Sequence, residues 1–385
     1  MFLFRSGIIF FAYLGISVYT GIRFLALVKY FLPSFRAFIF CPLYIGLCYS
    51  FMLFMFIRAG ALRQAGLNIF PAVVYFFLAL LVFDVVKLVL RLIYGPSSLP
   101  LAVIGTGIAL FLTVFLMVYG VFHARNIHTV FYTITLDKNA GGSSMRLALV
   151  SDIHIGRTVG RKWVANVVDT INLAKPDIIC LAGDIFDNDI SVVRDLEGVA
   201  EEFRRLKAPL GVFACPGNHD VDRLSLGAAL RDGATTNRLE EFFKNSGITF
   251  LQDEVLFVAE SFYLAGRRDA RPIGMKHGRK SAAELSTGLD KSRPFVIMDH
   301  QPVDYPMIEE SGADLILSGH THRGQFFPGN IATARIFKKA GAVHYGYWKG
   351  RSAQAVVSSG AGVWGPAIRV ATRSEVAVLD IKFAK

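Results

Sequence analysis

Five polar motifs in the second half of the sequence each follow a short apolar run. They carry Asp152 with His154, Asp184, Asn218-His219-Asp220, Asp299-His300 and His320-Thr321-His322. Carboxylate, imidazole and amide oxygen, with no thiolate among them, are donors that suit divalent ions such as Mn, Fe, Zn or Co. Several Asp and His together exceed the needs of one tetrahedral ion and indicate two ions, an arrangement that clamps the attacking and leaving oxygens of a phosphoryl displacement.

The same residues also have a structural interpretation, because Asp and Asn cap turns and are common in loops. Asp-x-His and Gly-Asp alone are weak signals. The runs Gly217-Asn218-His219-Asp220 and Gly319-His320-Thr321-His322 are moderately specific. The ordered set of five, each placed after a strand, favours a metal site over five independent turn caps.

The apolar runs before the motifs are typical of buried strands. We expect strands at 129–136, 146–150, 177–182, 211–215, 295–298 and 314–317, and helices around 164–171, 196–207 and 238–245. Strands that alternate with helices predict an α/β fold whose sheets are covered by helices. In such folds ligands bind beyond the carboxyl ends of the strands, which is where all five motifs lie.

Residues 1–128 differ in composition and predict a membrane region. They hold 19 of the 33 Phe, nine of the 41 Lys and Arg, and only one of the 30 Asp and Glu, Asp84. About 20 mostly apolar residues span a bilayer. Four segments qualify, near 6–22, 37–57, 67–90 and 101–122, so we predict a four-helix transmembrane region in 1–128 and a soluble domain in 129–385. A cleavable signal peptide is the alternative for the first segment, but no small-residue cleavage site follows it.

The few charged residues of the membrane region also suggest structural roles. Arg23 is expected to extend outward from the first span. Asp84 and Lys87 are expected to form a local ion pair near the end of the third span, and a functional role inside the membrane is the alternative. Because the basic excess lies mostly in this region, we expect no nucleic-acid partner. Lys and Arg flank both sides equally, so the positive-inside rule does not orient the chain.

The five motifs, in this order, resemble those of the calcineurin-like metallophosphoesterase superfamily, and the resemblance covers residues 129–385. It implies a two-sheet α/β (α+β) sandwich flanked by helices that holds two divalent metal ions. The implied ligands are Asp152, His154 and His322 for one ion, Asn218, His300 and His320 for the other, and Asp184 as the bridge. The resemblance also implies that His219 donates a proton to the phosphate or the leaving oxygen, with Asp220 orienting it.

A narrower resemblance lies in the run from Gly319 to Gln325 and in Trp364-Gly365-Pro366 with Arg369. These segments are similar to a bacterial subgroup with YkuE-like and YaeI-like phosphodiesterases, membrane proteins with a metallophosphoesterase domain, and LpxG-type UDP-2,3-diacylglucosamine pyrophosphatases. Arg323 stands where the subgroup's motif usually has Gly. Its side chain either reaches toward the substrate or points into solvent.

The resemblance implies a membrane-anchored phosphoesterase that hydrolyses a phosphodiester or pyrophosphate bond, on a lipid or nucleotide-linked lipid. It implies a multi-pass protein of the inner (plasma) membrane with its catalytic domain in the cytoplasm. The basic segment from Arg267 to Lys280 is either a lip that binds an anionic headgroup or an ordinary solvated loop. Two other functions stay open: a transporter or receptor-like membrane protein with a regulatory metallophosphoesterase module, and a metal-binding protein without turnover.

Overall fold

The computed structural model of the chain describes residues 2–54, 60–95, 100–142, 144–220, 237–270, 278–339 and 341–384. The chain divides into two compact units. One comprises residues 1–122 together with Gly365–Ile368, and the other comprises His123–Trp364 and Arg369–Lys385. Each unit has its own hydrophobic core.

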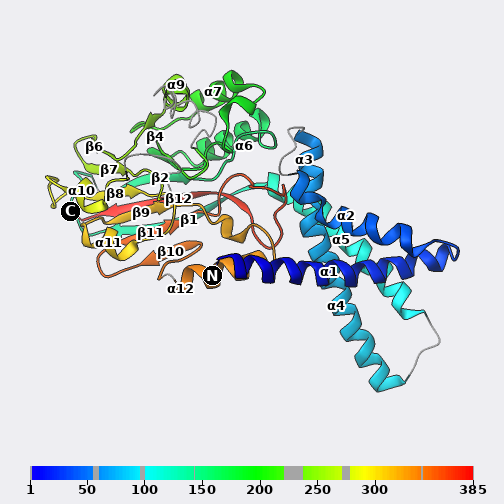
Figure 1. The fold of residues 1–385 in the computed structure, drawn as a ribbon. Helices are drawn as coiled ribbons and strands as arrows, with labels where there is room; N and C mark the ends of the chain where they lie inside the picture. Colours follow the sequence, from blue (N-terminus) through cyan, green and yellow to red (C-terminus); the bar gives the residue numbers. More distant parts are fainter. Residues whose placement is uncertain are drawn as a thin grey trace. The chain divides into compact units, whose positions relative to one another are not determined.

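The first unit is helical (Figure 1). Its helices are α1 (Phe2–Phe31), α2 (Ala37–Phe54), α3 (Gly60–Leu67), α4 (Ile69–Tyr94) and α5 (Leu101–Arg125). In the described residues, three apolar helical stretches are long enough to cross a membrane: Phe10–Phe31, Leu62–Tyr94 and Leu101–Arg125. The apolar stretch Ala37–Met52 is shorter than these. Three of the four expected spans therefore have the length and composition of a membrane helix, and the fourth stays a prediction.

The charges in this unit are arranged differently from the sequence-based expectation. Arg23 does not extend outward, because its guanidinium donates to both carboxylate oxygens of Asp84, at 2.6 and 2.7 Å. The expected local pair of Asp84 with Lys87 is not formed. Charged residues within membrane segments pair with one another, and here the partner of Asp84 comes from the neighbouring helix α1.

The second unit consists of two six-stranded sheets (Figure 1). The first sheet has the order β1 (Ile127–Leu136), β12 (Ser374–Phe383), β2 (Ser144–Val150), β3 (Ile178–Ala182), β4 (Val212–Cys215) and β5 (Thr249–Phe250). The second has the order β10 (Gly346–Lys349), β11 (Gln354–Val357), β9 (Leu315–Ser318), β8 (Phe295–Met298), β7 (Phe262–Gly266) and β6 (Glu254–Val258). Apart from β12 against β2, neighbouring strands of the first sheet pair in parallel.

The two sheets enclose the main core of this unit. Strand residues alternate between the two faces of a sheet, so Leu147 and Leu149 of β2 reach the same cluster as Val296 and Met298 of β8. Helices cover the outer faces: α6 (Arg161–Leu173) contacts β1 and β12, whereas α10 (Ala282–Ser286) and α11 (Tyr305–Glu310) pack on the second sheet. The remaining helices are η1 (Ile190–Val192), α7 (Leu196–Arg204), α9 (Asn237–Asn245), η2 (His322–Gly324) and α12 (Gly329–Lys339).

The predicted α/β sandwich is confirmed, and the strands that precede the five motifs are β2, β3, β4, β8 and β9. The C-terminal strand β12 was not expected. It inserts between β1 and β2, parallel to the first and antiparallel to the second. No local pattern could place it there, because strand order depends on contacts between residues far apart in the sequence.

Candidate metal centre

The first group of predicted ligands comes together at the carboxyl ends of β2 and β9. Asp152, His154 and His322 are all buried and present donor atoms within 4.8 Å of one another. The Nε2 atoms of His154 and His322 lie 2.9 Å apart, and Nε2 of His322 lies 3.5 Å from Oδ1 of Asp152. Two imidazole nitrogens and one carboxylate oxygen thus face a common point.

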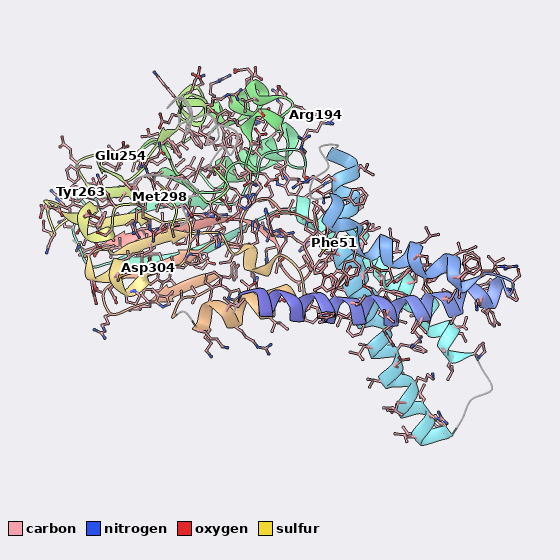
Figure 2. The ribbon with its side chains drawn as sticks, viewed as in Figure 1. Phe51, Arg194, Glu254, Tyr263, Met298 and Asp304 are labelled. Carbon is pink, nitrogen blue, oxygen red and sulfur yellow. The ribbon has the colours of Figure 1, made fainter. Side chains whose placement is uncertain are left out.

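The second group lies beside the first, and its Asp184 lies close to His154 of the first group. Asp184, His300 and His320 also present donors within 4.8 Å of one another. His300 stands two residues after Met298, the last residue of β8. Met298 is labelled in Figure 2. Oδ2 of Asp184 lies 3.0 Å from Nε2 of His300 and 3.7 Å from Nε2 of His154. One carboxylate oxygen therefore sits between histidines of both groups.

Hydrogen bonds to neighbouring groups fix the orientation of Asp152 and His300. Oδ2 of Asp152 accepts a hydrogen bond from the Ser151 hydroxyl at 2.5 Å, and the His320 backbone N–H is shared between Oδ2 and Oδ1 at 2.9 and 3.1 Å. Oδ1 is the oxygen nearer the ring of His322. His300 has its Nδ1 2.8 Å from the carbonyl oxygen of Ala182. An Nδ1–H bonded in this way leaves the Nε2 lone pair for a metal, the usual arrangement of metal-binding histidines.

The backbone at these positions is in an unusual conformation. Five of the seven predicted ligands have a left-handed φ: 51° at Asp152, 53° at His154, 53° at Asp184, 71° at His320 and 47° at His322. Non-glycine residues adopt this region at a cost and do so mainly where the surrounding structure holds them for function. Such a concentration of left-handed residues is not expected of ordinary turn caps.

Two glycines permit the close packing of the loops. A Cβ at Gly217 would lie 2.2 Å from Oδ1 of Asp184, and one at Gly319 would lie 2.4 Å from Oδ2 of Asp152. Each glycine therefore allows a neighbouring loop to approach a carboxylate that any larger residue would displace.

The electrostatics of the buried groups suit bound cations. Burial lowers the pKa of His154 to about 4 and holds the pKa of His322 well below its usual value, so both rings are neutral with lone pairs available near pH 7. Burial and the charge of Asp184 raise the pKa of Asp152. Two buried carboxylates that repel each other in this way are stabilised by a cation between them.

Asn218 provides a test of whether these residues fit a metal ion. Its Oδ1 atom is buried and has no hydrogen-bond partner among the described residues. A buried amide oxygen without a partner costs about 1–3 kcal/mol, so such atoms are rare unless they bind something. Amide oxygen is a recognised ligand for hard divalent ions. The donor set therefore fits the metal ions that the sequence suggested.

His219 lies at the edge of the same site. Its backbone N–H donates to Oδ1 of Asp184 at 2.7 Å, and its ring is 5.0 Å from the ring of His154. Its Nδ1 lies 3.5 Å from Oδ1 of Asp187 and 2.7 Å from the amide of Asn188. Burial would lower the pKa of His219, but the hydrogen bond with Asp187 and the nearby carboxylates raise it above its usual value.

Asp220 is bonded to the backbone of two neighbouring loops. Both of its carboxylate oxygens accept backbone N–H groups, from Phe186 at 2.8 Å and from Gly217 at 2.9 Å. Asp220 therefore joins the loops after β3 and β4. Asp187 lies beside the His219 ring, and the orienting role expected of Asp220 stays a prediction. Asp187 belongs to the run Gly183-Asp184-Ile185-Phe186-Asp187, and its spacing from Asp184 was the signal that could have identified it.

Comparison with known proteins identifies the domain. Residues 145–324 match the family model described as calcineurin-like phosphoesterase. This part of the chain is a calcineurin-like phosphoesterase domain. The match includes all the predicted ligands and His219, and the domain belongs to a family of metal-dependent phosphoric ester hydrolases.

Relatives of the phosphoesterase domain include membrane proteins. The chain is 29% identical over 292 residues to a zebrafish (Danio rerio) transmembrane protein with metallophosphoesterase domain, covering 72% of this chain and 63% of that one. It is 27% identical to an uncharacterized metallophosphoesterase of Campylobacter jejuni, with 63% and 60% covered, and 28% identical to the Escherichia coli phosphodiesterase YaeI, with 47% and 61% covered. The chain thus spans less than two thirds of the length of each of these relatives.

Two further features of the phosphoesterase domain were open in the sequence. Arg323 places its guanidinium 4.2 Å from the ring centroid of Tyr345, so its side chain stacks on an aromatic ring. The described residues of the basic segment are used in ion pairs and hydrogen bonds: Arg267 and Arg279 bind Asp299, and Lys280 binds Asp253. Arg271, Lys276 and His277 of that segment lie outside the described residues.

Arg369 is a residue of the site whose role sequence analysis missed. It is fully buried and donates to backbone carbonyl oxygens of the loop that follows β11. The sequence analysis noted Arg369 only as part of a resemblance. A lone Arg near the end of a sequence carries no local signal that it packs against a metal centre.

Proposed function

We propose that this protein is a membrane-anchored phosphoesterase that hydrolyses a phosphodiester or pyrophosphate bond at a binuclear metal centre. One observation carries the proposal: the Asp184 carboxylate oxygen that lies 3.0 Å from His300 Nε2 and 3.7 Å from His154 Nε2. A carboxylate placed between two sets of donors is what a bridged metal pair requires.

The proposed ligands divide between the two groups. Asp152, His154 and His322 hold one ion, Asn218, His300 and His320 hold the other, and Asp184 bridges them. Mn, Fe and Zn are the ions that best suit these donors. When bound, such ions supply positive charge that activates water and neutralises the charge of a phosphoryl group.

The proposed role of His219 is to donate a proton to the phosphate or the leaving oxygen. Its backbone is fixed to Asp184, and its Nδ1 is turned toward Asp187 and Asn188. The other ring nitrogen, Nε2, is then the atom for proton transfer. A raised pKa keeps the ring protonated to a higher pH, as a general acid requires.

We infer from the membrane helices that the substrate is a lipid or a nucleotide-linked lipid, of the UDP-2,3-diacylglucosamine type. Three apolar helices long enough to span a bilayer belong to the same chain as the phosphoesterase domain, and a fourth span at α2 completes the proposed bundle. We place the protein in the inner membrane with its catalytic domain in the cytoplasm, without a nucleic-acid partner. A reporter fused after Lys385 that is active only outside the cytoplasm would refute this orientation.

The transporter alternative receives less support from the helices. The buried hydroxyls of Ser17, Thr20 and Thr113 donate to backbone carbonyls one turn earlier in their own helices. Side chains bonded in this way satisfy their own helix and do not line a polar path. These contacts favour an anchor for the hydrolase.

The test is hydrolysis by the purified full-length protein in detergent with added Mn²⁺. Wild-type protein should cleave bis(p-nitrophenyl) phosphate, and Asp184→Asn should lose more than 99% of this activity together with bound metal, measured by plasma mass spectrometry. Asp189→Asn is the matched control, because Asp189 only caps the short helix η1. Wild-type turnover by the Asp184 variant would refute the binuclear centre.

The substrate class needs a separate panel of UDP-diacylglucosamine, other phospholipids and cyclic nucleotides. A lipid-linked substrate should be turned over with the highest kcat/KM. If cyclic nucleotides or other soluble esters are preferred, the phosphoesterase assignment stands and the lipid assignment is wrong.

A further inference from the structure

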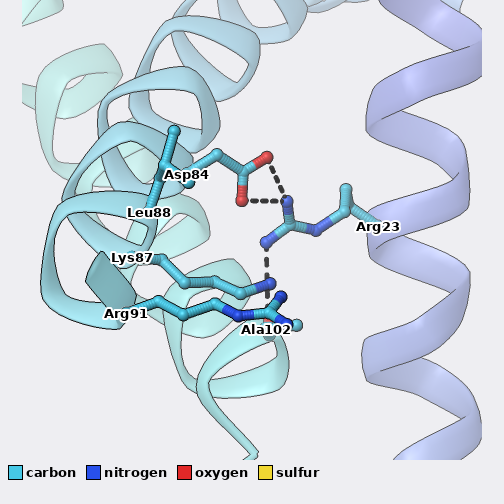
Figure 3. Close-up of a pocket in the computed structure, with 6 residues that line it drawn as sticks. All are labelled: Arg23, Asp84, Lys87, Leu88, Arg91 and Ala102. Atoms are coloured by element: carbon cyan, nitrogen blue, oxygen red, sulfur yellow. Dashed lines mark hydrogen bonds and ion pairs between the residues drawn. The ribbon is translucent and has the colours of Figure 1, made fainter. Parts of the chain in front are cut away.

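A second cluster of charged side chains lies among the membrane helices, apart from the metal ligands. Three polar residues and one leucine of α4 lie at positions i, i+3, i+4 and i+7, so they share one face of the helix. With one residue from α1 and one from α5 they line a pocket of about 360 Å³: Arg23, Asp84, Lys87, Leu88, Arg91 and Ala102 (Figure 3).

Arg23 is held in place within this pocket. It bonds both oxygens of Asp84, and its second terminal nitrogen donates to the backbone carbonyl oxygen of Ala102 at 3.3 Å. The hydroxyl of Tyr19 also donates to Asp84. The Arg23 side chain is only 13% exposed, and its positive charge is balanced by the carboxylate of Asp84. Together with the bond to Ala102, this pair links α1, α4 and α5.

Lys87 and Arg91 have no such match. Within the described part of the chain, neither side chain forms an ion pair or a hydrogen bond, although the charge of Lys87 is felt by Asp84. Both side chains point toward Arg23 and Ala102 in Figure 3. The pocket therefore has three cations and one carboxylate. Cations in a membrane segment are costly and are retained where they bind a partner. An anion with one or two negative charges would balance the two unmatched cations.

The surroundings of the pocket indicate what carries that anion. The adjacent surface of α4 is apolar and open: Val85 is 56% exposed, Leu88 57% and Leu92 77%. A free phosphate ion would use the cations alone, whereas a phospholipid would use both the cations and this apolar surface. We propose that the pocket binds the phosphate group of an anionic phospholipid whose acyl chains lie along α4.

The position of the pocket agrees with a headgroup site. Lys87 and Arg91 lie in the last turns of α4, which ends at Tyr94, and Ala102 lies in the first turn of α5. The 25 residues of α5 extend about 37 Å, roughly the thickness of a bilayer. The pocket thus lies at the membrane face opposite to the one where the chain leaves α5 at Arg125.

The test measures lipid binding by the full-length protein in phosphatidylcholine nanodiscs. Phosphatidylglycerol is the probe, and native mass spectrometry or a thermal-shift titration gives its apparent affinity. Each Lys or Arg near an anionic lipid contributes about 1 kcal/mol, so the double variant Lys87→Gln/Arg91→Gln should bind roughly thirtyfold more weakly. Lys29→Gln/Arg36→Gln is the matched control, since both residues are exposed and lie at the same end of the bundle outside the pocket.

The outcomes separate the sources of the anion. If both double variants lose affinity for phosphatidylglycerol equally, or if neither loses affinity, the proposed lipid site in this pocket is wrong. Inorganic phosphate can also bind at the proposed metal centre, so this comparison uses Asp184→Asn protein with EDTA. Millimolar phosphate should not stabilise that protein in phosphatidylcholine, and if it does so as well as phosphatidylglycerol, the lipid assignment is wrong.

Two further measurements do not depend on the pocket variants. When lipids are removed from the wild-type protein, phosphatidylglycerol should stay bound longer than phosphatidylcholine. Equal retention of the two lipids would refute the proposal even if the variants fail to fold. Asp184→Asn should bind phosphatidylglycerol normally, so lipid binding and hydrolysis can fail independently.

Discussion

The buried guanidinium of Arg369 donates a 3.2 Å hydrogen bond to the backbone carbonyl oxygen of His322. It also donates to the carbonyl oxygens of Ser359, Gly360 and Gly362, at 2.7, 3.2 and 2.8 Å. Arg369 therefore ties the loop after β11 to the loop that carries a proposed metal ligand. A residue outside the family match thus positions the backbone of the metal centre.

Replacing Arg369 by Met removes that donor from four buried carbonyl oxygens, each of which costs about 1–3 kcal/mol when unpaired. We expect Arg369→Met to lower the free energy of unfolding by at least about 3 kcal/mol and to weaken metal binding roughly 10- to 100-fold. Denaturant unfolding and calorimetric metal titration measure these effects. Arg373→Met, at an exposed position nearby, should change neither. Equal effects of the two substitutions would argue against a positioning role for Arg369.

Asn218 allows metal binding to be separated from folding. Because its Oδ1 has no partner among the described residues, Asn218→Ala should leave the stability of the chelated protein within about 0.5 kcal/mol of wild type. In excess Mn²⁺, the variant should lose much of the stabilisation that the metal gives the wild type. Thermal unfolding with EDTA and with Mn²⁺ makes the comparison, with Asn245→Ala, at an exposed position, as the control. Full metal stabilisation of Asn218→Ala would exclude Asn218 as a ligand.

His219 should affect turnover without affecting metal content. We expect His219→Ala to reduce kcat roughly 10²- to 10⁴-fold, the usual contribution of a general acid, while the protein keeps its metals. Asp187→Asn should cause a smaller loss, because it removes only the charge beside the His219 ring. Kinetics on a phosphodiester with a poor leaving group, combined with metal analysis, provide the measurement. Loss of metal in the His219 variant would instead make His219 a ligand.

Glu309 gives a prediction for acid stability away from the metal centre. Its Oε1 accepts the backbone N–H groups of Ser352 and Ala353 at 2.6 and 2.9 Å. Burial would raise the pKa of Glu309, but these hydrogen bonds lower it below its usual value. A carboxyl with a lowered folded-state pKa stabilises the fold above its unfolded pKa, and this contribution is lost as the pH falls through the folded pKa.

Glu309→Gln should therefore lower the free energy of unfolding by about 1 kcal/mol at pH 7, and the difference should shrink as the pH falls through the lowered folded-state pKa of Glu309. Unfolding of the two proteins between pH 3.5 and 8 checks this. A difference that stays constant over the whole range would show that the charge of Glu309 is not responsible.

The resemblance singled out residues that the structure brings together in two groups able to hold a metal ion, because these residues occur in short motifs that each follow a buried strand. Asp152 and His154, or His320 and His322, are placed by local spacing alone once β2 and β9 form. The predicted ends of the strands agree with the structure to within two residues, because short apolar runs in the sequence mark them. Asp220 shows what the sequence did not indicate, because its carboxylate is bonded to the backbone of Phe186 and Gly217 in two different loops.

The membrane region shows the same limit. Hydropathy located the helices, because about 20 apolar residues have few alternatives to crossing a bilayer. The partner of Asp84 was decided by helix packing: Arg23 is 61 residues away in the sequence, whereas Lys87 is three residues away and does not pair.

By itself, the sequence determined which donors are present, which strands carry them and which segments are apolar enough for a membrane. These properties depend on residue type and short spacing. Only the tertiary structure decided that β12 lies between β1 and β2, that Asp187 faces His219, that Arg369 supports His322 and that Arg23 pairs with Asp84. Each of these joins parts of the chain whose approach is set by sheet order or helix packing, and no local pattern encodes that approach.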